Sequence, residues 1–484
     1  MYTKKLLVFI AALAVSVNAF SAARVAKPVS EDFKKSVIYQ ILLPAFTQEG
    51  TINKAAEMLP YVKSLGVDIV YLCPLTEHDD DMDQKFWSER QKAAKTNNPK
   101  NPYRMKDYFK IDPSYGTSAD VKKFVETAHS LGLKVIFDLV YYHCGPKANI
   151  IREHPDFVLY KPDGSFDTGE WAFPKLNFKN KELREYLTKN MEYFVREYNI
   201  DGYRTDVGEM VPSDFWDAAA KRVRKIKPEL LMIEESERHS ATEKTYDATY
   251  EVLWQRRTIE VFHDKKPAKI LRERWESFDK EQPKNARVLR AMENHDFANG
   301  PFRKRCEIRF GYRGMDAVMV MNFTLDGIPF IYSGNEFADD APMTIFSDRT
   351  HGRYFTEWAN MFTEQGKRRM ALVKKLIELR KDPVFYDGKT RWLDNDKPDA
   401  VLSYTRESKE GAAFVVINAS DKCVSTTVDA DFGGSSELLS YGAKCESDNG
   451  KTKLELQPKG YIVLRKSAEN RKPKVLRRNR APIM

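Results

Sequence analysis

Short apolar runs alternate with longer amphipathic stretches from about residue 36 to residue 385. This alternation of strand-length and helix-length patterns predicts parallel strands joined by crossover helices. Seven apolar runs have the length and composition of strands: residues 37–43, 67–73, 134–140, 202–205, 230–233, 288–292 and 328–331. No stretch rich in Gly, Pro or Ser interrupts the repeat. We therefore predict an α/β fold in which residues 30–390 form a (β/α)8 TIM barrel, in preference to an open doubly wound sheet.

The stretch between the second and third predicted strands shows the helical pattern most clearly. Thr117 is a suitable capping residue, and apolar residues from Val121 to Ala128 recur at intervals of three and four. Gly132 then provides a residue suited to ending a helix. The spacing predicts an amphipathic helix whose apolar stripe packs on the barrel.

The pattern changes after residue 395. Short apolar runs at residues 400–405, 412–417, 453–456 and 461–464 alternate with turn residues at 408–411 and 448–450. This spacing predicts an all-β C-terminal domain, a β-sandwich over residues 395–466. Residues 467–484 have no periodicity and carry six basic residues against one acidic residue, which predicts a disordered basic tail.

Composition narrows the class of protein. Hydrophobic residues make up 42% of the 484 residues and aromatic residues 12%, which is typical of a folded globular protein. The formal net charge of +9 lies mostly in the tail and at the N-terminus, so the rest of the chain is nearly neutral. A nearly neutral body offers no basic face to a nucleic acid, and we predict no nucleic-acid partner.

The N-terminal residues have the layout of a secretory signal. Lys4 and Lys5 precede an apolar run over residues 6–17, and small residues follow within 19–23. This order predicts a signal peptide at residues 1–22 and an exported protein, either periplasmic or extracellular. The run is shorter than the ~20 residues that span a bilayer. No later segment is long and uncharged enough either, so we predict no permanent membrane span.

The five cysteines show neither CxxC nor metal-ligand spacing, and we predict no zinc site. Disulfides persist in exported proteins. Cys423 and Cys445, both in the predicted β domain, are the first candidates for a disulfide. Cys73 and Cys144, at the ends of neighbouring strands, are the second.

Polar residues that end the predicted strands are the candidates for chemistry, because barrel enzymes carry their sites at that end. Asp138 lies inside the third apolar run, where it is either a structural strut or a site residue. Arg204 and Asp206 are two residues apart, so both side chains lie on one face of a strand. The guanidinium would keep the carboxylate ionised and fixed, which suits a nucleophile, although a structural salt bridge has the same pattern.

Two further strand ends add carboxylates. Glu234 and Glu235 are adjacent, so only one of them faces the barrel axis, and periodicity does not decide which. Glu293 and Asp296 follow the run at 288–292. A pair of carboxyl groups, one ionised and one protonated, is what glycoside cleavage requires. Several nearby aromatic residues either stack on sugar rings or belong to the core: Trp87, Tyr103, Tyr141, Tyr142 and Trp171.

With these residues in place, the chain resembles the α-amylase family of glycoside hydrolases, family 13. Seven segments resemble the family's motifs and occur in the family's order. They are residues 37–41 (the first strand), 107–117 (the segment before the second helix), 138–143, 202–206, 232–235 and 293–296 (regions I to IV), and 327–336 (the final strand).

The resemblance implies a retaining mechanism with Asp206 as the nucleophile, Glu235 as the general acid/base and Asp296 as the stabiliser. It implies an α-glucan or malto-oligosaccharide substrate, a small insertion at about 144–177 after the third strand, and a C-terminal β domain. It also implies further residues that hold the substrate or the catalytic carboxylates. These are Arg204, His143, His295, Asp138 and Tyr103, the last where the family places a tyrosine under the sugar.

The chain departs from the family's pattern in two places. Tyr142 stands where α-amylases have an Asn that binds a structural calcium, and a phenol is a poor calcium ligand. We therefore expect no required cofactor, although an acidic loop at 79–83 could hold Ca²⁺ or be a solvated charge run. Residues 207–210 lack the Lys-His pair of many endo-acting amylases. The alternatives are an exo-acting α-glucosidase, a transglycosylase, or a non-catalytic glucan-binding relative, which the complete carboxylate set disfavours.

Overall fold

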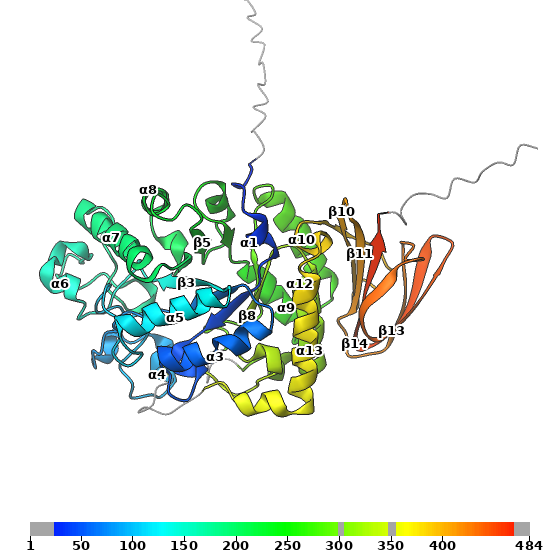
Figure 1. Ribbon diagram of the computed structural model, residues 1–484, viewed down its shortest axis with the longest axis horizontal. Coiled ribbons are helices and arrows are strands. Elements are labelled where there is room, and N and C mark those ends of the chain that lie inside the picture. The colour runs from blue at the N-terminus through cyan, green and yellow to red at the C-terminus, as the bar shows by residue number, and fades with distance from the viewer. Residues whose placement is uncertain (1–23, 299–303, 347–354, 469–484) are drawn as a thin grey trace, which may run out of the picture.

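The computed structural model describes residues 24–298, 304–346 and 355–468. The predicted signal peptide at residues 1–22 and the predicted basic tail beyond residue 468 lie outside these ranges. Within them, eight parallel strands form the barrel (Figure 1): β1 (Ile38–Ile41), β2 (Ile69–Leu72), β3 (Lys134–Leu139), β4 (Gly202–Thr205), β5 (Leu231–Glu234), β6 (Ala248–Thr249), β7 (Leu289–Arg290) and β8 (Ile328–Tyr332). The predicted (β/α)8 fold is confirmed.

The strands are hydrogen-bonded in the order β6-β5-β4-β3-β2-β1-β8-β7. A parallel bridge between Thr249 and Val288 joins the two outer strands, so the sheet closes on itself. Strand β6 has no counterpart among the predicted strands, because its two residues are too short to form an apolar run. The register pairs Asp138 with Arg204, and it brings the ends of β3, β4 and β5 to one mouth of the barrel.

Helices surround the barrel strands (Figure 1). In chain order they are α1 (Glu31–Lys35), α2 (Leu43–Phe46), α3 (Ile52–Ser64), α4 (Glu89–Ala93), α5 (Ser118–Ser130), α6 (Asn149–Glu153), α7 (Lys181–Tyr198), α8 (Ser213–Val223), α9 (Val252–Phe262), α10 (Lys269–Glu281), α11 (Cys306–Phe310), α12 (Tyr312–Thr324), α13 (Glu364–Leu379) and α14 (Pro383–Tyr386). Helix α5 is the amphipathic helix predicted from the sequence. Thr117 and Asp120 form a capping box at its start, and its apolar residues are buried.

The segment after β3 forms a small excursion before α7. It contains α6 and single antiparallel bridges, such as Val158 to Leu176 and Tyr160 to Phe166. The excursion begins beside His143, whose backbone is bridged to Lys175. One wall of the barrel mouth therefore comes from this segment.

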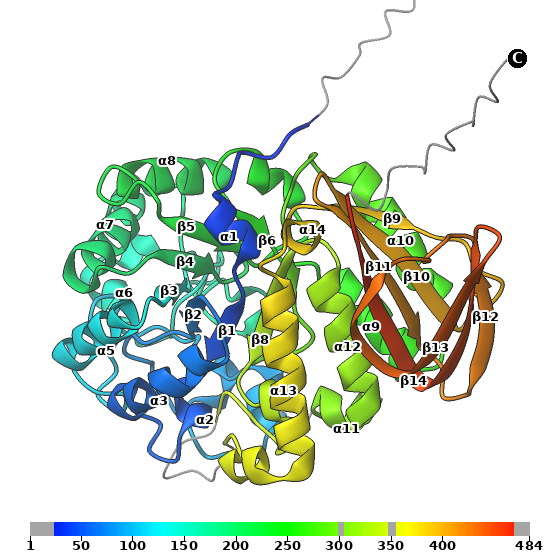
Figure 2. The same cartoon turned by 45° about the vertical axis from the view of Figure 1, so that its right-hand side comes forward.

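The C-terminal domain is an antiparallel sheet beside α12, α14 and α10 (Figure 2). Its strands are β9 (Lys389–Trp392), β10 (Val401–Ser408), β11 (Gly411–Asn418), β12 (Val424–Val428), β13 (Ser436–Asp448) and β14 (Lys451–Ser467). Strand β14 pairs with β11, β12 and β13, so the layers of the predicted sandwich are parts of one continuously hydrogen-bonded sheet. Asn449 and Gly450, both with positive φ, form the two-residue turn between β13 and β14.

The two faces of the domain bury different cores. In β11, Ala413 and Val415 belong to the core shared with the barrel, whereas Phe414 and Val416 belong to a separate cluster. The Tyr404 and Thr324 hydroxyls lie 2.7 Å apart and add a polar contact between β10 and α12. The domain is therefore packed against the barrel helices through the inner face of its sheet.

The predicted disulfides are absent, because all five cysteines are free thiols. Cys445 lies on β13 and Cys423 immediately precedes β12, and these two strands flank β14 on opposite sides. Two strand spacings of about 4.8 Å separate them, which exceeds the ~7 Å limit between the Cα atoms of a disulfide. Within the described ranges no helix has the length and apolar character needed to cross a membrane.

Candidate active site

Arg204 is the centre of a cluster of carboxylates at the barrel mouth. Its Nη1 donates to Asp138 Oδ1 at 2.8 Å and to Asp206 Oδ1 at 2.9 Å. Its Nη2 lies 2.6 Å from Glu235 Oε2. The guanidinium is buried, and three carboxyl groups from three neighbouring strand ends balance its charge. The structure thus brings together three residues that the sequence placed on separate strands.

Asp138 lies beneath this cluster. Besides the Arg204 contact, its Oδ2 accepts hydrogen bonds from Tyr71 Oη at 2.6 Å and Tyr103 Oη at 2.9 Å. Its side chain has no exposed surface. The sequence left open whether Asp138 is a structural residue or a site residue, and the geometry favours the structural role. Asp138 holds Arg204 and Tyr103 in place, while its own oxygens are not open to a ligand.

Glu235 and Glu234 point in opposite directions, as strand alternation requires. Glu235 Oε2 accepts a hydrogen bond from the Val207 N–H at 2.9 Å, so it faces the mouth. Glu234 is buried on the other side, where its carboxylate accepts from Ser236 Oγ at 2.7 Å and pairs with Arg238. Periodicity could not decide which of the two glutamates faces the barrel mouth, and the register of β5 shows that it is Glu235.

The turn after Asp206 is strained. Val207 has φ of 38°, a left-handed value that is costly for a β-branched residue. The conformation directs the Val207 N–H at Glu235. A Cβ at Gly208 would lie 2.5 Å from Thr205 Oγ1 and 2.6 Å from Glu234 Cγ, so only glycine fits there. The turn therefore connects Asp206 and Glu235 through the backbone as well as through Arg204.

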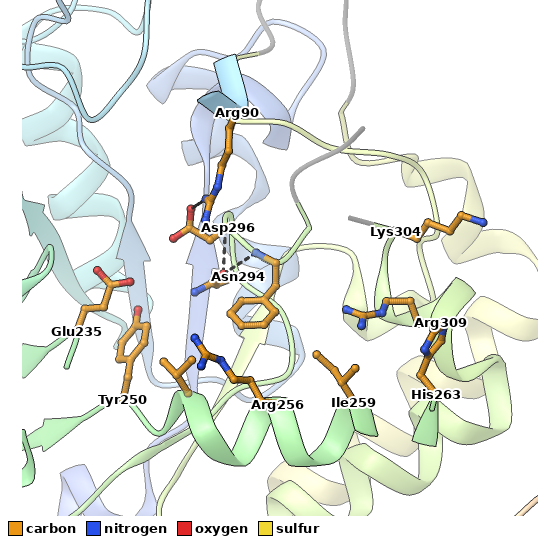
Figure 3. Close-up of a pocket in the computed structure, with 12 residues that line it drawn as sticks. Arg90, Glu235, Tyr250, Arg256, Ile259, His263, Asn294, Asp296, Lys304 and Arg309 are labelled. Carbon is orange, nitrogen blue, oxygen red and sulfur yellow. Dashed lines mark hydrogen bonds and ion pairs between the residues drawn. The ribbon is translucent and has the colours of Figure 1, made fainter. Parts of the chain in front are cut away.

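Asp296 completes the set of carboxylates, on the loop after β7. The Asn294 side chain accepts hydrogen bonds from the Asp296 and Phe297 backbone N–H groups, both at 2.9 Å (Figure 3). Glu293, the first residue of the same motif, instead forms an ion pair with Arg305 at 2.9 Å, which holds the loop in place. Of the motif's two carboxylates, only Asp296 reaches the mouth.

Asp296 has two cationic or polar neighbours. Arg90, on α4, forms an ion pair with it (Figure 3). His295 Nε2 lies 3.5 Å from Asp296 Oδ2. No sequence pattern indicated Arg90, because helical spacing relates only residues of one helix and Asp296 lies some 200 positions further along the chain. The contact needs the folded barrel to form.

The two histidines are held in defined orientations. The Gln40 amide lies 2.8 Å from His295 Nδ1, and the Tyr103 ring stacks on His295 with centroids 5.0 Å apart. His143 Nε2 lies 3.0 Å from the Tyr103 carbonyl oxygen, so Nε2 is the donor. Burial lowers the pKa of both imidazoles, that of His143 to about 4, so the His143 ring is neutral at pH 7.

The three mouth carboxyls differ in protonation. Burial is the main cause that raises the pKa of Asp206 and of Glu235, with Arg204 opposing it in both cases. Burial also opposes the ionisation of Asp296, but His295 and Arg90 overcome it and lower the pKa of Asp296 to about 2. The site thus favours one carboxylate that is always ionised, beside two carboxyls that retain a proton more readily.

The predicted aromatic residues separate into core and mouth. Tyr141 stacks on Trp216 with centroids 5.7 Å apart, and Trp87 is 2% exposed, so both belong to the core. Tyr142 and Trp171 lie beside His143 at the mouth. Tyr250, which no motif indicated, faces the Arg204 guanidinium at 5.6 Å.

The residues present do not fit the family's usual calcium site. The Tyr142 ring packs edge-on against Trp171 and offers no amide oxygen. In the acidic loop, Asp79 pairs with Arg104 at 3.3 Å and Asp81 with Lys147 at 3.2 Å. Among the described residues no group of three His, Cys, Asp or Glu side chains is arranged to hold a metal ion.

A cleft of about 570 Å³ opens beside the carboxylates (Figure 3). Glu235, Asp296 and Tyr250 line one end, and residues of α9 form the floor. This cleft is large enough for several sugar units. Its other end is basic, with Lys304 and Arg309, and Arg256 lies between the two ends (Figure 3).

The chain matches a known family model and several known proteins. Residues 29–163 and 166–384 match the family model described as Alpha amylase, catalytic domain. The chain is 26% identical over 446 residues to a maltogenic α-amylase of Bacillus acidopullulyticus, covering 86% of this chain and 70% of that one. It is 26% identical over 410 residues to a cyclomaltodextrinase of Thermoanaerobacter pseudethanolicus, covering 77% of this chain and 64% of that one.

Solved structures show the same fold. The crystal structure of a maltogenic α-amylase from Thermotoga neapolitana superposes with a TM-score of 0.76, at 24% identity, over 90% of this chain and 99% of that chain. An α-amylase from Lactobacillus plantarum superposes with a TM-score of 0.73 at 23% identity, over 90% and 99% of the two chains. The likeness extends over the barrel and the C-terminal sheet.

Proposed function

Since the chain belongs to the α-amylase family of glycoside hydrolases, we propose that it hydrolyses α-glucosidic bonds of malto-oligosaccharides or starch-like α-glucans by double displacement. The observation that carries the proposal is that Asp206 and Glu235 contact the same Arg204 guanidinium, at 2.9 and 2.6 Å. The names of the relatives, a maltogenic amylase and a cyclomaltodextrinase, support a malto-oligosaccharide substrate.

In the first step Asp206 attacks the anomeric carbon while Glu235 gives its proton to the leaving oxygen. Arg204 holds Asp206 in place through the 2.9 Å hydrogen bond and favours its ionised form. Burial raises the pKa of both Asp206 and Glu235, and two adjacent negative charges repel, so the pair retains one proton. We assign this proton to Glu235, because the family resemblance makes Asp206 the nucleophile and a nucleophile must be ionised.

Asp296 stabilises the positive charge that develops on the sugar ring. Its pKa of about 2 keeps it ionised throughout the working pH range. In the second step Glu235 removes a proton from water, which attacks the covalent glycosyl ester on Asp206 and releases a product with retained configuration. Tyr103, stacked on His295 at the base of the site, provides the surface on which the sugar ring rests.

Two further parts of the proposal rest on the sequence and on the Tyr142 site. The charged, apolar and small residues at the N-terminus support export to the periplasm or the exterior. The Tyr142 packing and the ion pairs of the acidic loop support an enzyme that needs no calcium. The mechanism above uses no metal.

Digestion of maltoheptaose, starch, pullulan and isomaltose with product sizing tests the proposal. Hydrolysis of maltoheptaose by the wild type, lost in Asp206→Asn, is the expected result. Mixed short products indicate endo-action, glucose alone indicates an exo-acting α-glucosidase, and longer products indicate a transglycosylase. An Asp206→Asn variant that folds and digests maltoheptaose at the wild-type rate contradicts the proposal.

A further inference from the structure

The cleft has one acidic and one basic end. Glu235 and Asp296 lie at the acidic end, and Arg256 of α9 projects into the middle of the space (Figure 3). Arg309 of α11 and Lys304, just before this helix, line the other end. Cations from two separate segments thus face one cleft that also contains the proposed catalytic acid.

Three cations of the cleft have no acidic partner among the described residues. Arg256, Lys304 and Arg309 form no ion pair or side-chain hydrogen bond with any described residue. The adjacent Arg257, in contrast, is bound to Glu260 at 2.6 Å, and Arg90 is bound to Asp296. Most of the arginines near the mouth are neutralised, whereas the ones in this part of the cleft are not.

Arg256 and Lys304 are exposed and Arg309 is half-buried, so water solvates them in the free protein, and a neutral α-glucan bound in the cleft would not compensate their charge. Like charges around one cleft repel one another, and an anion between them would relieve that repulsion. The planar guanidinium also matches the geometry of phosphate, sulfate or carboxylate oxygens. The chemistry of the basic end is therefore that of an oxyanion site.

We propose that the preferred substrate is an α-glucan that carries an anionic group, which the unpaired cations Arg256, Lys304 and Arg309 attract while Glu235 acts on a bond nearby. The inference rests on the proposed glycosidase function and adds the substrate class to it. Ile259 lies between the two ends of the cleft and provides an apolar face for the intervening sugar units (Figure 3). The anionic group itself is a phosphate, a sulfate or a uronic carboxylate.

The test compares kcat/KM for neutral maltotetraose with that for maltotetraose bearing one phosphate, one sulfate or one uronic acid unit. We expect the wild type to prefer at least one of the three anionic forms about tenfold, as a charge-assisted contact allows. The arm that shows the preference identifies the source of the anion. Raising the salt concentration should reduce the preference, because the cations are partly solvated.

Variants locate the preference in the cleft. Arg256→Gln and Arg309→Gln should each lower the ratio of anionic to neutral kcat/KM several-fold, and Arg256→Lys should retain most of it. Arg257→Gln is the matched control, because Arg257 is the next residue on α9, is exposed and does not line the cleft. It should leave the ratio unchanged. Melting curves establish that each variant is folded.

Each outcome separates the two proposals. Equal kcat/KM for the neutral and all the anionic substrates overturns the anionic-substrate inference while leaving the glycosidase function intact. A preference that persists in both Arg256→Gln and Arg309→Gln also overturns it, because the anion then binds elsewhere. Failure to cleave any of the four substrates instead contradicts the proposed function.

Discussion

Glu234 and Glu235 at the end of β5 provide a test in which one strand supplies both the variant and its control. Replacement by Gln changes the volume of either side chain very little. Glu235 faces the mouth and lies 2.6 Å from Arg204, whereas Glu234 is bound to Ser236 and Arg238 on the other side. Glu235→Gln should therefore lower the reaction rate, whereas Glu234→Gln should lower the free energy of unfolding.

Glu235→Gln removes the proton donor and acceptor of both steps. General acid–base catalysis contributes about 10²–10⁴-fold, so kcat on maltotriose should fall by at least that factor. Glu234→Gln keeps an acceptor for Ser236 but loses the buried charge beside Arg238. Hydrogen bonds to charged groups contribute about 1.5–3 kcal/mol, so the free energy of unfolding should fall by about that amount. Its kcat should change far less.

α-Maltosyl fluoride sharpens the assay, because fluoride leaves without protonation. Glu235→Gln should release a burst of about one fluoride per active site and then stall, since it lacks the base for the second step. Asp206→Asn should give no burst. If Glu234→Gln loses more activity than Glu235→Gln, or if Glu235→Gln gives no burst, the assignment of the acid is wrong.

The remaining predictions concern pH, metal and thiols. The pKa of Asp296 falls from 3.8 to about 2 on folding, so its ionised form stabilises the protein above pH 3.8 and this effect is lost as the pH falls through 2. The difference in unfolding free energy between wild type and Asp296→Asn, measured by urea unfolding, should therefore shrink below about pH 4. Chelation with EDTA should leave the thermal midpoint unchanged, and a large drop would show that a metal is part of the fold. Denatured, unreduced protein should titrate with five free thiols; three would indicate one disulfide.

Local patterns were sufficient to predict the barrel and to place several carboxylates at the ends of its strands. Strand alternation correctly placed Arg204 and Asp206 on one face, because a period of two holds in any strand. The capping box of α5 was legible for a similar reason, since it depends on residues three positions apart. These features lie within single elements, where sequence spacing fixes spatial arrangement.

Other features depend on contacts between elements. Nothing near Arg90 indicates that α4 folds over Asp296, and the two-residue strand β6 is defined by its neighbours rather than by its own pattern. The same holds for Asp138, because its structural role is visible only from the hydrogen bonds that Tyr71 and Tyr103 donate to its Oδ2. The predicted disulfide between Cys423 and Cys445 is absent because β14 lies between the strands that carry them.

The stereochemistry of the first product tests the mechanism most directly. A nucleophile and an acid that share one guanidinium lie close together, and a separation of about 5–5.5 Å leaves no room for an intervening water. A covalent intermediate on Asp206 then requires that the anomeric configuration be retained. Proton NMR during the first minutes of maltotriose digestion should show the α anomer before mutarotation sets in. Initial release of the β anomer would contradict the double displacement and the role of Asp206 as nucleophile.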